Sequence, residues 1–336
     1  MSAPKLVVTA SPHLKAHDST PRIMWNVVGS LVPIIVMAGW FFGVSALLVV
    51  VASCAGALAT ERAFGPGGTL RDGSAVITGI LLGLTLPAGM PLWIVFLGGA
   101  FAIGVGKLLF GGLGYNIFNP ALLGRAFLQA AFPVAITTWP AVGGSWWTLK
   151  GDNFALPFMS ARTDALTAPT PLNLMKFEHQ GTGTGVLALG DHGGSLGETS
   201  AILIVICGAY LAWRGFLNWR IPVSILLTVA GLAALLHLAN PQYPTAAFML
   251  LSGGLMLGAV FMATDMVTAP VTNKGRWIFG IGIGSLVVAI RLWSGLPEGV
   301  MYAILLMNAM VPFINKATQP RIFGAAAAKP AKEGAA

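Results

Sequence analysis

The chain has 336 residues, of which 56% are hydrophobic and only 9% are charged, and its mean hydropathy is +0.79. Soluble chains carry about 25% charged residues, so this chain lacks the polar surface that a soluble protein needs. Its formal net charge of +8 comes without a basic cluster that includes aromatic residues, which argues against a nucleic-acid partner. We therefore predict an all-α polytopic membrane protein in contact with lipid.

Apolar stretches of about 20 residues, the length that spans a bilayer as a helix, occur ten times along the chain. Their unbroken apolar runs differ from the alternating pattern of an outer-membrane barrel, so we expect helices. The stretches cover residues 23–43, 44–62, 72–90, 91–110, 116–138, 198–217, 221–239, 244–264, 276–293 and 298–316. The expected organisation is a segment 1–22, a five-helix repeat 23–138, a loop 139–197, a second five-helix repeat 198–316 and a tail 317–336.

The distribution of Lys and Arg predicts the orientation of these spans. With the N-terminus inside, fourteen of the 19 basic residues fall on the inner side, four fall outside, and Arg125 lies within the fifth span. Because basic residues concentrate in cytoplasmic loops, we expect both termini in the cytoplasm and the loop 139–197 on the outer face. Arg125, a cation in a span, should pair with a carboxylate or an anionic ligand group.

The two halves of the chain resemble each other weakly. Residues 72–90 and 244–264 are both Gly-rich, and each has an acidic residue at its edge, Asp72 and Asp265. Since each half has five spans, the second repeat should be inverted, and interrupted helices in corresponding places mark a central site in transporter-like folds. Close helix packing explains the same glycines equally well. A carboxylate at such a place binds a cation, relays a proton or caps a helix, and capping is a strong alternative for Asp72.

The stretch KLLFGGLGYNIFNPALLGRA, residues 107–126, is dense in glycine and amide side chains. Asn116 and Asn119 offer donors and acceptors that suit the edge of a flat heteroaromatic ring, although an Asn-Pro pair also fits a helix kink. The chain has no Walker A motif and no dinucleotide-binding glycine motif, which argues against an ATPase or a Rossmann site. Cys54 and Cys207 are far apart, so we expect no metal centre or iron–sulfur cluster within this chain.

Four segments carry a resemblance to a known family. They are DGSAVITGILLGLTLP, KLLFGGLGYNIFNPALLGRAF, FMATDMVTAPVTNKGR and GLPEGVMYAILLMNAMVP, and in this order they resemble the NqrB/RnfD family of ion-translocating electron-transport complexes over residues 10–320. The N-terminal segment is short and lacks the long extension typical of NqrB, so the resemblance is greater to RnfD. The resemblance implies a flavin-carrying electron-transfer subunit of the bacterial inner membrane. With other Rnf subunits it would couple ferredoxin/NAD chemistry to Na⁺ or H⁺ translocation.

The resemblance also implies cofactors and site residues. Family members carry FMN on a threonine of the outer loop, attached as a phosphoester by a flavin transferase that recognises a pattern like Asp-x-x-Ser/Thr-Gly-Ala-Thr. Asp164, Thr167 and Thr170 match its polar positions, so Thr170 is the expected acceptor and Thr167 the second choice, while Ala168 and Pro169 depart from the pattern. The family further implies a noncovalent flavin such as riboflavin, for which we expect the segment of Asn116 and Asn119.

Asp72 and Asp265 are then candidates for the ion pathway. The sequence identifies no catalytic residue, and we expect no complete active site in this chain alone. Two other hypotheses stay open. The chain could be a solute transporter or channel of inverted-repeat architecture without a redox role, or a structural anchor for redox partners.

Overall fold

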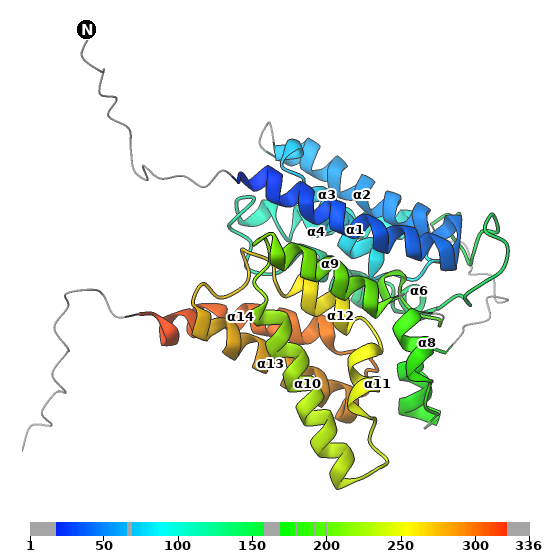
Figure 1. Ribbon diagram of the computed structural model, residues 1–336. Coiled ribbons are helices and arrows are strands. Elements are labelled where there is room, and N and C mark those ends of the chain that lie inside the picture. The colour runs from blue at the N-terminus through cyan, green and yellow to red at the C-terminus, as the bar shows by residue number, and fades with distance from the viewer. Residues whose placement is uncertain are drawn as a thin grey trace, which may run out of the picture.

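The computed structural model describes residues 18–65, 69–157, 169–178, 180–190, 192–198 and 200–320. Every regular element in these ranges is a helix, which confirms the predicted all-α fold (Figure 1). Six helical stretches are long and apolar enough to cross a membrane, which indicates a multi-pass membrane protein. They are α1 (Thr20–Phe42), α2 (Val44–Phe64), α4 (Leu92–Gly104) with the 3-10 turn η2 (Leu108–Phe110), α10 (Arg220–Ala239), α13 (Asn273–Trp293) and α14 (Val300–Thr318).

The other four predicted spans form shorter or interrupted helices. Pro133 begins a new helix, and Gly253 has a φ of +67°, a conformation that glycine adopts far more readily than other residues. The chain therefore leaves the helical path at these places. The elements are α3 (Ser74–Leu84), α5 (Pro120–Ala131) with α6 (Pro133–Thr137), α9 (Ala201–Trp213), and α11 (Ala246–Leu251), α12 (Leu255–Leu257) and the π-helix η5 (Gly258–Met262).

The long loop has local structure of its own in the part that is described. It carries short helical segments, and one of them, α7 (Pro171–Asn173), begins directly after Thr170, the predicted flavin acceptor. The others are the π-helix η3 (Leu174–Glu178), α8 (Thr184–Leu189) and the 3-10 turn η4 (Leu196–Glu198). A further 3-10 turn, η1 (Thr69–Arg71), lies between α2 and α3.

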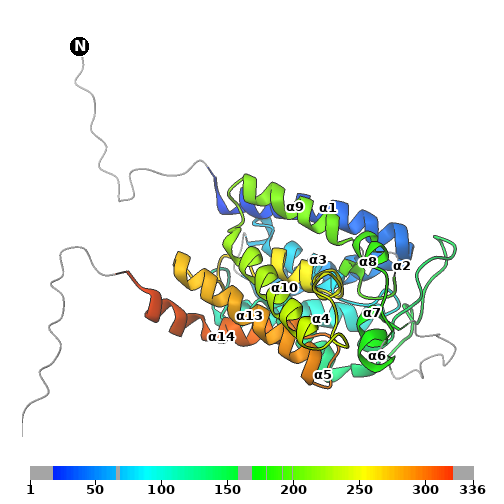
Figure 2. The same cartoon turned by 60° about the horizontal axis from the view of Figure 1, so that its bottom comes forward.

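The helices of the two halves pack in similar pairs. In the first half α2 packs along α4 and α3, and in the second half α10 packs along α13 and α11. Likewise, α5 packs on α4 and α14 packs on α13. The halves meet where α1 lies beside α9, which both ribbon views show, and where α14 contacts α5 (Figures 1 and 2).

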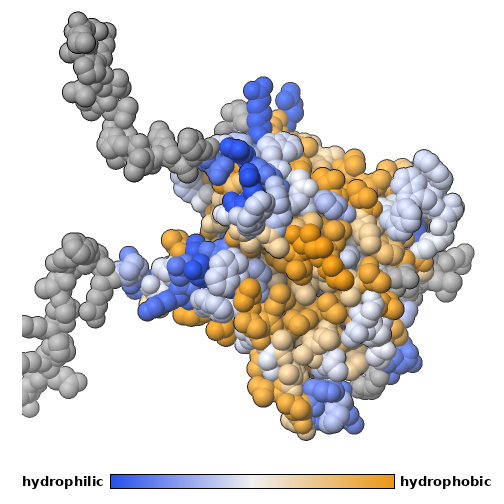
Figure 3. Space-filling model, in the orientation of Figure 1, coloured by the Kyte–Doolittle hydropathy of each residue, from blue (hydrophilic) through white to orange (hydrophobic). Residues whose placement is uncertain are grey.

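One end of the bundle holds the first residues of α1 and the last residues of α14, and we call it the termini end (Figure 1). There the Trp25 indole N–H donates to the carbonyl of Arg71 at 3.2 Å, and the hydroxyls of Thr272 and Thr318 lie 2.5 Å apart. Hydrophilic side chains gather at this end, and apolar side chains cover much of the rest of the face that Figure 3 shows.

Described residues of the loop 139–197 lie at the opposite end, which we call the loop end. The Trp146 indole N–H donates to the carbonyl of Gly39 near the end of α1, at 2.8 Å. The Lys176 ammonium donates to the carbonyl of Arg291 near the end of α13, at 2.9 Å. These described parts of the loop therefore lie at one end of the bundle, and the start of α1 and the end of α14 lie at the other.

Tight packing of α2 against α4 gives a testable expectation for Gly99. A Cβ atom at this position would collide with the carbonyl oxygen of Ser53 and lie 3.1 Å from the backbone nitrogen of Ala57. We expect Gly99→Val to destabilise the fold by about 1–3 kcal/mol, because neither backbone group yields easily. Thermal unfolding of the purified protein in detergent measures the change. Gly104→Ala is the control, since its Cβ would meet only Thr60 Cγ2 at 3.5 Å; equal losses for both variants would contradict the expectation.

Candidate functional site

Two cavities among the described residues contain predicted site residues, one at each end of the bundle. The first, which we call the terminal cavity, has a volume of about 100 Å³ and lies at the termini end. Segments from both halves of the chain build it, and they bring three predicted site residues together. Its polar lining consists of Ser74, Thr78, Lys107, Asn116, Asn119, Thr264 and Asp265.

Asn119 joins the two halves at this cavity. Its side-chain oxygen accepts hydrogen bonds from the backbone nitrogens of Ala121 at 3.0 Å and Leu122 at 3.3 Å, so it caps the first turn of α5. Its side-chain nitrogen donates to the carbonyl of Met262 at 3.0 Å, at the last residue of η5. The amide thus holds the start of α5 against the end of the interrupted helix, and both its nitrogen and its oxygen are engaged within the protein.

We expect Asn119→Ala to destabilise the protein by about 1–2 kcal/mol, because the variant loses both the helix cap and the link to Met262. Thermal unfolding in detergent measures this loss. Asn218→Ala is a matched control, since among the described residues its side chain accepts a single hydrogen bond, from the Arg220 backbone nitrogen two residues away. A variant at Asn119 with wild-type stability would show that the link contributes nothing.

The two predicted carboxylates lie at this end, and both have local partners. Asp72 accepts from the backbone nitrogen of Ser74 at 2.8 Å and from its hydroxyl at 2.6 Å, so it acts as a cap at the start of α3. Asp265 accepts from the Val267 backbone nitrogen at 3.4 Å and from the Thr268 hydroxyl at 3.1 Å. Burial raises the pKa of the Asp265 carboxyl, although the hydrogen bonds oppose this shift.

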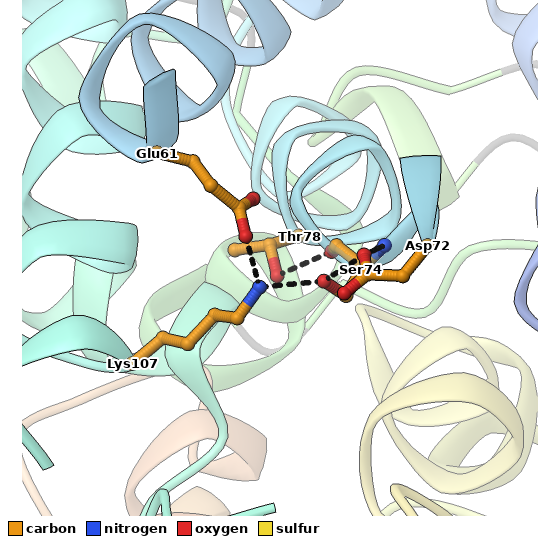
Figure 4. A network of polar contacts seen from close by, with 5 residues as sticks. All are labelled: Glu61, Asp72, Ser74, Thr78 and Lys107. Carbon is orange, nitrogen blue, oxygen red and sulfur yellow. Dashed lines mark hydrogen bonds and ion pairs between the residues drawn. The ribbon is translucent and has the colours of Figure 1, made fainter. Parts of the chain in front are cut away.

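A buried ion pair borders the same cavity, and no pattern in the sequence indicated it. The Lys107 ammonium donates to Glu61 Oε1 at 2.5 Å and to the Ser74 hydroxyl at 2.6 Å (Figure 4). The side chains of Lys107 and Glu61 are 3% and 0% exposed. Since the Ser74 hydroxyl in turn donates to Asp72, a continuous polar chain runs from Asp72 to Glu61. The signal that could have pointed to it was a single carboxylate inside the apolar stretch 44–62.

The second cavity, which we call the loop cavity, has a volume of about 220 Å³ and lies at the loop end. The Arg125 guanidinium is bound to Glu298 there, with Nη2 and Oε2 2.6 Å apart, which confirms the predicted pairing of Arg125 with a carboxylate. Glu198 lines the same cavity and accepts a hydrogen bond from the Ser195 hydroxyl at 2.7 Å. The polar lining consists of Arg125, Gln129, Thr137, Thr170, Asn173, Glu198 and Glu298.

Thr170 lies in the wall of the loop cavity and is 8% exposed. Its hydroxyl oxygen accepts a hydrogen bond from the backbone nitrogen of Asn173 at 3.3 Å, so it caps α7. The structure therefore brings this predicted acceptor into one cavity with Arg125, a residue from the first half of the chain. Asp164 and Thr167, the other two residues of the predicted pattern, lie outside the described residues.

The interruption between α11 and α12 is held by two charged side chains from the second half. Arg291 donates to the carbonyls of Met249 at 2.6 Å and Ser252 at 2.8 Å, which end the first helical piece. Glu298 accepts from the backbone nitrogen of Gly254 at 2.9 Å, where the second piece begins. A cation at the carboxyl end and an anion at the amino end match the helix dipoles. Glu298 thus links the loop cavity to the interrupted helix, a role that sequence reasoning missed.

Comparison with known proteins identifies the family. The model of the NQR2, RnfD, RnfE family matches residues 7–324. A Clostridium ljungdahlii protein, named as a subunit of a proton-translocating ferredoxin:NAD(+) oxidoreductase complex, is 40% identical and covers 94% of this chain and 96% of its own length. An Acetobacterium woodii protein, named as a subunit of a Na(+)-translocating ferredoxin:NAD(+) oxidoreductase complex, is 41% identical, over 96% of this chain and 97% of its own. A Stutzerimonas stutzeri protein, named as a subunit of an ion-translocating oxidoreductase complex, is 42% identical, over 91% and 93%. Because these matches extend over nearly the whole chain, it belongs to the NQR2, RnfD, RnfE family.

Proposed function

We propose that this chain is the flavin-carrying electron-transfer subunit of a membrane complex that couples ferredoxin/NAD redox chemistry to the translocation of Na⁺ or H⁺. The names of its relatives support the coupling, and they name H⁺ for one relative and Na⁺ for another. We further propose that FMN is attached to Thr170 as a phosphoester. The observation that carries this proposal is the shared cavity of the Thr170 hydroxyl and the Arg125 guanidinium.

The residues of the loop cavity fit the phosphate end of FMN. Arg125 is 7% exposed, and its Nε atom is buried without a hydrogen-bond partner among the described residues. A guanidinium with a free donor beside a hydroxyl suits a phosphate monoester or diester. The cavity of about 220 Å³ is smaller than the roughly 300–1,000 Å³ of pockets that enclose whole ligands. The fit therefore concerns the phosphate and not the ring system.

Each residue then has a defined task. The Thr170 oxygen would form the new bond to phosphorus while the bond to the leaving phosphate group of an activated flavin donor breaks, and the hydroxyl proton would pass to solvent or to the transferase. Arg125 would bind the phosphate oxygens, and Glu298 would keep Arg125 oriented through their ion pair. When bound, FMN supplies electron transfer, and the protein supplies its position and electrostatic surroundings.

For the ion pathway we propose the carboxylates at the terminal cavity. Asp265 lines that cavity, and Asp72 is connected to it through Ser74, which also lines it. Carboxylate oxygens are suitable ligands for Na⁺, and a carboxyl with a raised pKa is suited to carry a proton. Asp72 has the weaker support because its hydrogen bonds with Ser74 also fit a helix cap.

The second, noncovalent flavin stays a prediction. The Asn119 amide is engaged on both sides, and the side-chain nitrogen of Asn116 donates to the carbonyl of Phe118 at 3.3 Å. With a volume of about 100 Å³, the terminal cavity in this arrangement does not fit an isoalloxazine ring. No step of the proposed function uses a flavin at that place.

We also propose that residues 23–138 and 198–316 are inverted repeats, in the bacterial inner membrane, with both termini in the cytoplasm. The corresponding helix pairs of the two halves and the basic residues near the termini end support this arrangement. The flavin transferase would then meet the loop on the outer face. The partners are other Rnf subunits, which must supply the nicotinamide and iron–sulfur sites, and membrane lipid.

A transporter without a redox role is the second candidate, and the interrupted helix between α11 and α12 favours it. Coexpression with a flavin transferase separates the two functions. Under the proposed function, the denatured chain fluoresces in a gel, and a tryptic fragment that contains Thr170 gains the mass of FMN. The purified complex should also reduce NAD with ferredoxin and form an ion gradient. A dark, unmodified chain in an active complex would refute covalent attachment, and a complex that lacks redox activity would favour the transporter.

A further inference from the structure

Asn308, in the middle of α14, has polar atoms that the protein leaves without partners. The residue is 1% exposed, and both its side-chain oxygen and its side-chain nitrogen are buried without a hydrogen-bond partner among the described residues. Buried polar groups in native proteins nearly always have a partner, and where protein groups do not supply it, an internal water molecule does. An amide with both ends unpaired therefore points to a bound polar ligand.

The backbone adds a third polar atom at the same place. Pro312 lies within α14, four residues after Asn308. Because proline has no N–H, it cannot donate to the Asn308 carbonyl, which is its partner in a regular α-helix. A water molecule can accept from the amide nitrogen and donate to an oxygen, so it satisfies both kinds of group. A bare cation would bind only the oxygens and leave the nitrogen unpaired.

Asn308 lies at the middle of a helix that is long and apolar enough to cross a membrane. Helix α14 has 19 residues and is therefore about 28 Å long, close to the roughly 30 Å of a bilayer's hydrocarbon core. Asn308 is the ninth of these residues. An unpaired polar group at such a depth costs free energy, and so does a water molecule among apolar side chains. The two costs fall when the water and the amide bind each other. Because polar groups at this depth are usually functional, such a site indicates a function.

The face of α14 that carries Asn308 connects the two ends of the bundle. Met301, seven residues before Asn308, lines the loop cavity. Ile304, one turn before it, lies against Gly258 of η5, where an added Cβ would meet Ile304 Cδ1 at 3.5 Å. Asn315, seven residues after Asn308, accepts a hydrogen bond from the Val271 backbone nitrogen at 3.1 Å at the termini end. This spacing of three and four residues keeps these side chains on one helix face.

The two elements that α14 contacts on this side also reach the cavities. Helix α5 begins at the terminal cavity with Asn119 and extends to the loop cavity with Arg125. The π-helix η5 lines the terminal cavity with Val260 and Phe261. Both elements pack against α14. The seam between α14, α5 and η5 therefore connects residues of one cavity with residues of the other, and Asn308 lies on the same face of α14, seven residues from both Met301 and Asn315.

We propose that Asn308 binds a buried water molecule at mid-membrane, and that this water hydrates the translocated ion or relays the translocated proton between the terminal cavity and the loop cavity. The proposal rests on the proposed function in one respect, since it assumes that the complex translocates an ion.

The test uses the whole complex with Asn308→Leu, reconstituted in liposomes. Leucine has a similar size and removes both unpaired atoms, so the fold should persist. We expect ion uptake driven by ferredoxin-dependent NAD reduction to fall by about tenfold or more, since an ion or proton then meets an apolar passage. Met307→Leu is the matched control, because Met307 faces Gly282 of α13 and should leave uptake unchanged. A high-resolution map of the wild-type complex should show water density bonded to Asn308, absent in the leucine variant.

Wild-type ion uptake by Asn308→Leu would overturn the proposal, and so would a wild-type map in which protein groups alone satisfy the Asn308 amide. The mass of the Thr170 fragment is measured in the same preparations. If that fragment lacks FMN while Asn308→Leu still blocks uptake, the flavin assignment fails and the water site stands.

Discussion

Thr170→Val is expected to remove all covalently bound flavin from the chain. Valine has nearly the shape of threonine but no hydroxyl, so no phosphoester can form at this position. The loop cavity should otherwise persist, since the Arg125–Glu298 ion pair does not involve Thr170. The variant loses the hydrogen bond that caps α7, a segment of three residues whose loosening should stay local. In-gel flavin fluorescence and the mass of the tryptic fragment, after coexpression with the transferase, measure the result.

Two variants make this expectation specific. Thr170→Ser keeps a hydroxyl and the capping oxygen and should retain flavin. Thr167→Ser keeps the hydroxyl that the recognition pattern requires at this position and should also retain flavin. Fluorescence that survives in Thr170→Val and disappears in Thr167→Val would move the attachment to Thr167. Retained activity of a complex with Thr170→Val would instead support a structural anchor.

Lys107→Met is expected to destabilise the protein by about 3–5 kcal/mol, because it leaves the Glu61 carboxylate buried without its cation. Glu61 is 1% exposed, and its second oxygen already lacks a hydrogen-bond partner among the described residues. The Ser74 hydroxyl, the other group that Lys107 contacts, already donates its proton to Asp72. It therefore cannot replace the lost cation as a partner of Glu61 (Figure 4). Thermal unfolding of the purified protein in detergent measures the loss.

The double variant Glu61→Leu/Lys107→Met should recover most of the lost stability, because it replaces a buried ion pair by apolar groups. Arg62→Met serves as a surface control, since Arg62 is exposed and follows Glu61 directly in α2. A Lys107→Met protein as stable as this control would show that the ion pair is dispensable. Failure of the double variant to recover would assign another role to one of the two residues.

The fold class was predictable from the sequence because lipid imposes strong local constraints. Long apolar stretches with few charges must form helices, and the sequence located the six long ones as well as the apolar segments between them. The lengths of the other four were less predictable. Glycine at residue 253 and proline at residue 133 interrupt two of them, and a hydropathy pattern registers apolar character without the backbone conformation that ends a helix.

The place of Arg125 in an apolar stretch indicated a cation in need of an anionic partner, which the structure confirms. The family pattern suggested Thr170 as the flavin acceptor, and this stays a prediction. Arg125 pairs with Glu298, and Lys107 pairs with Glu61. Both pairings arise because segments that are distant along the chain pack together. An ion pair depends on the distance between two side chains in space, which no local pattern encodes. For the same reason only the tertiary structure decided that Thr170 and Arg125 share a cavity and that Asn308 is buried with its amide unpaired among the described residues.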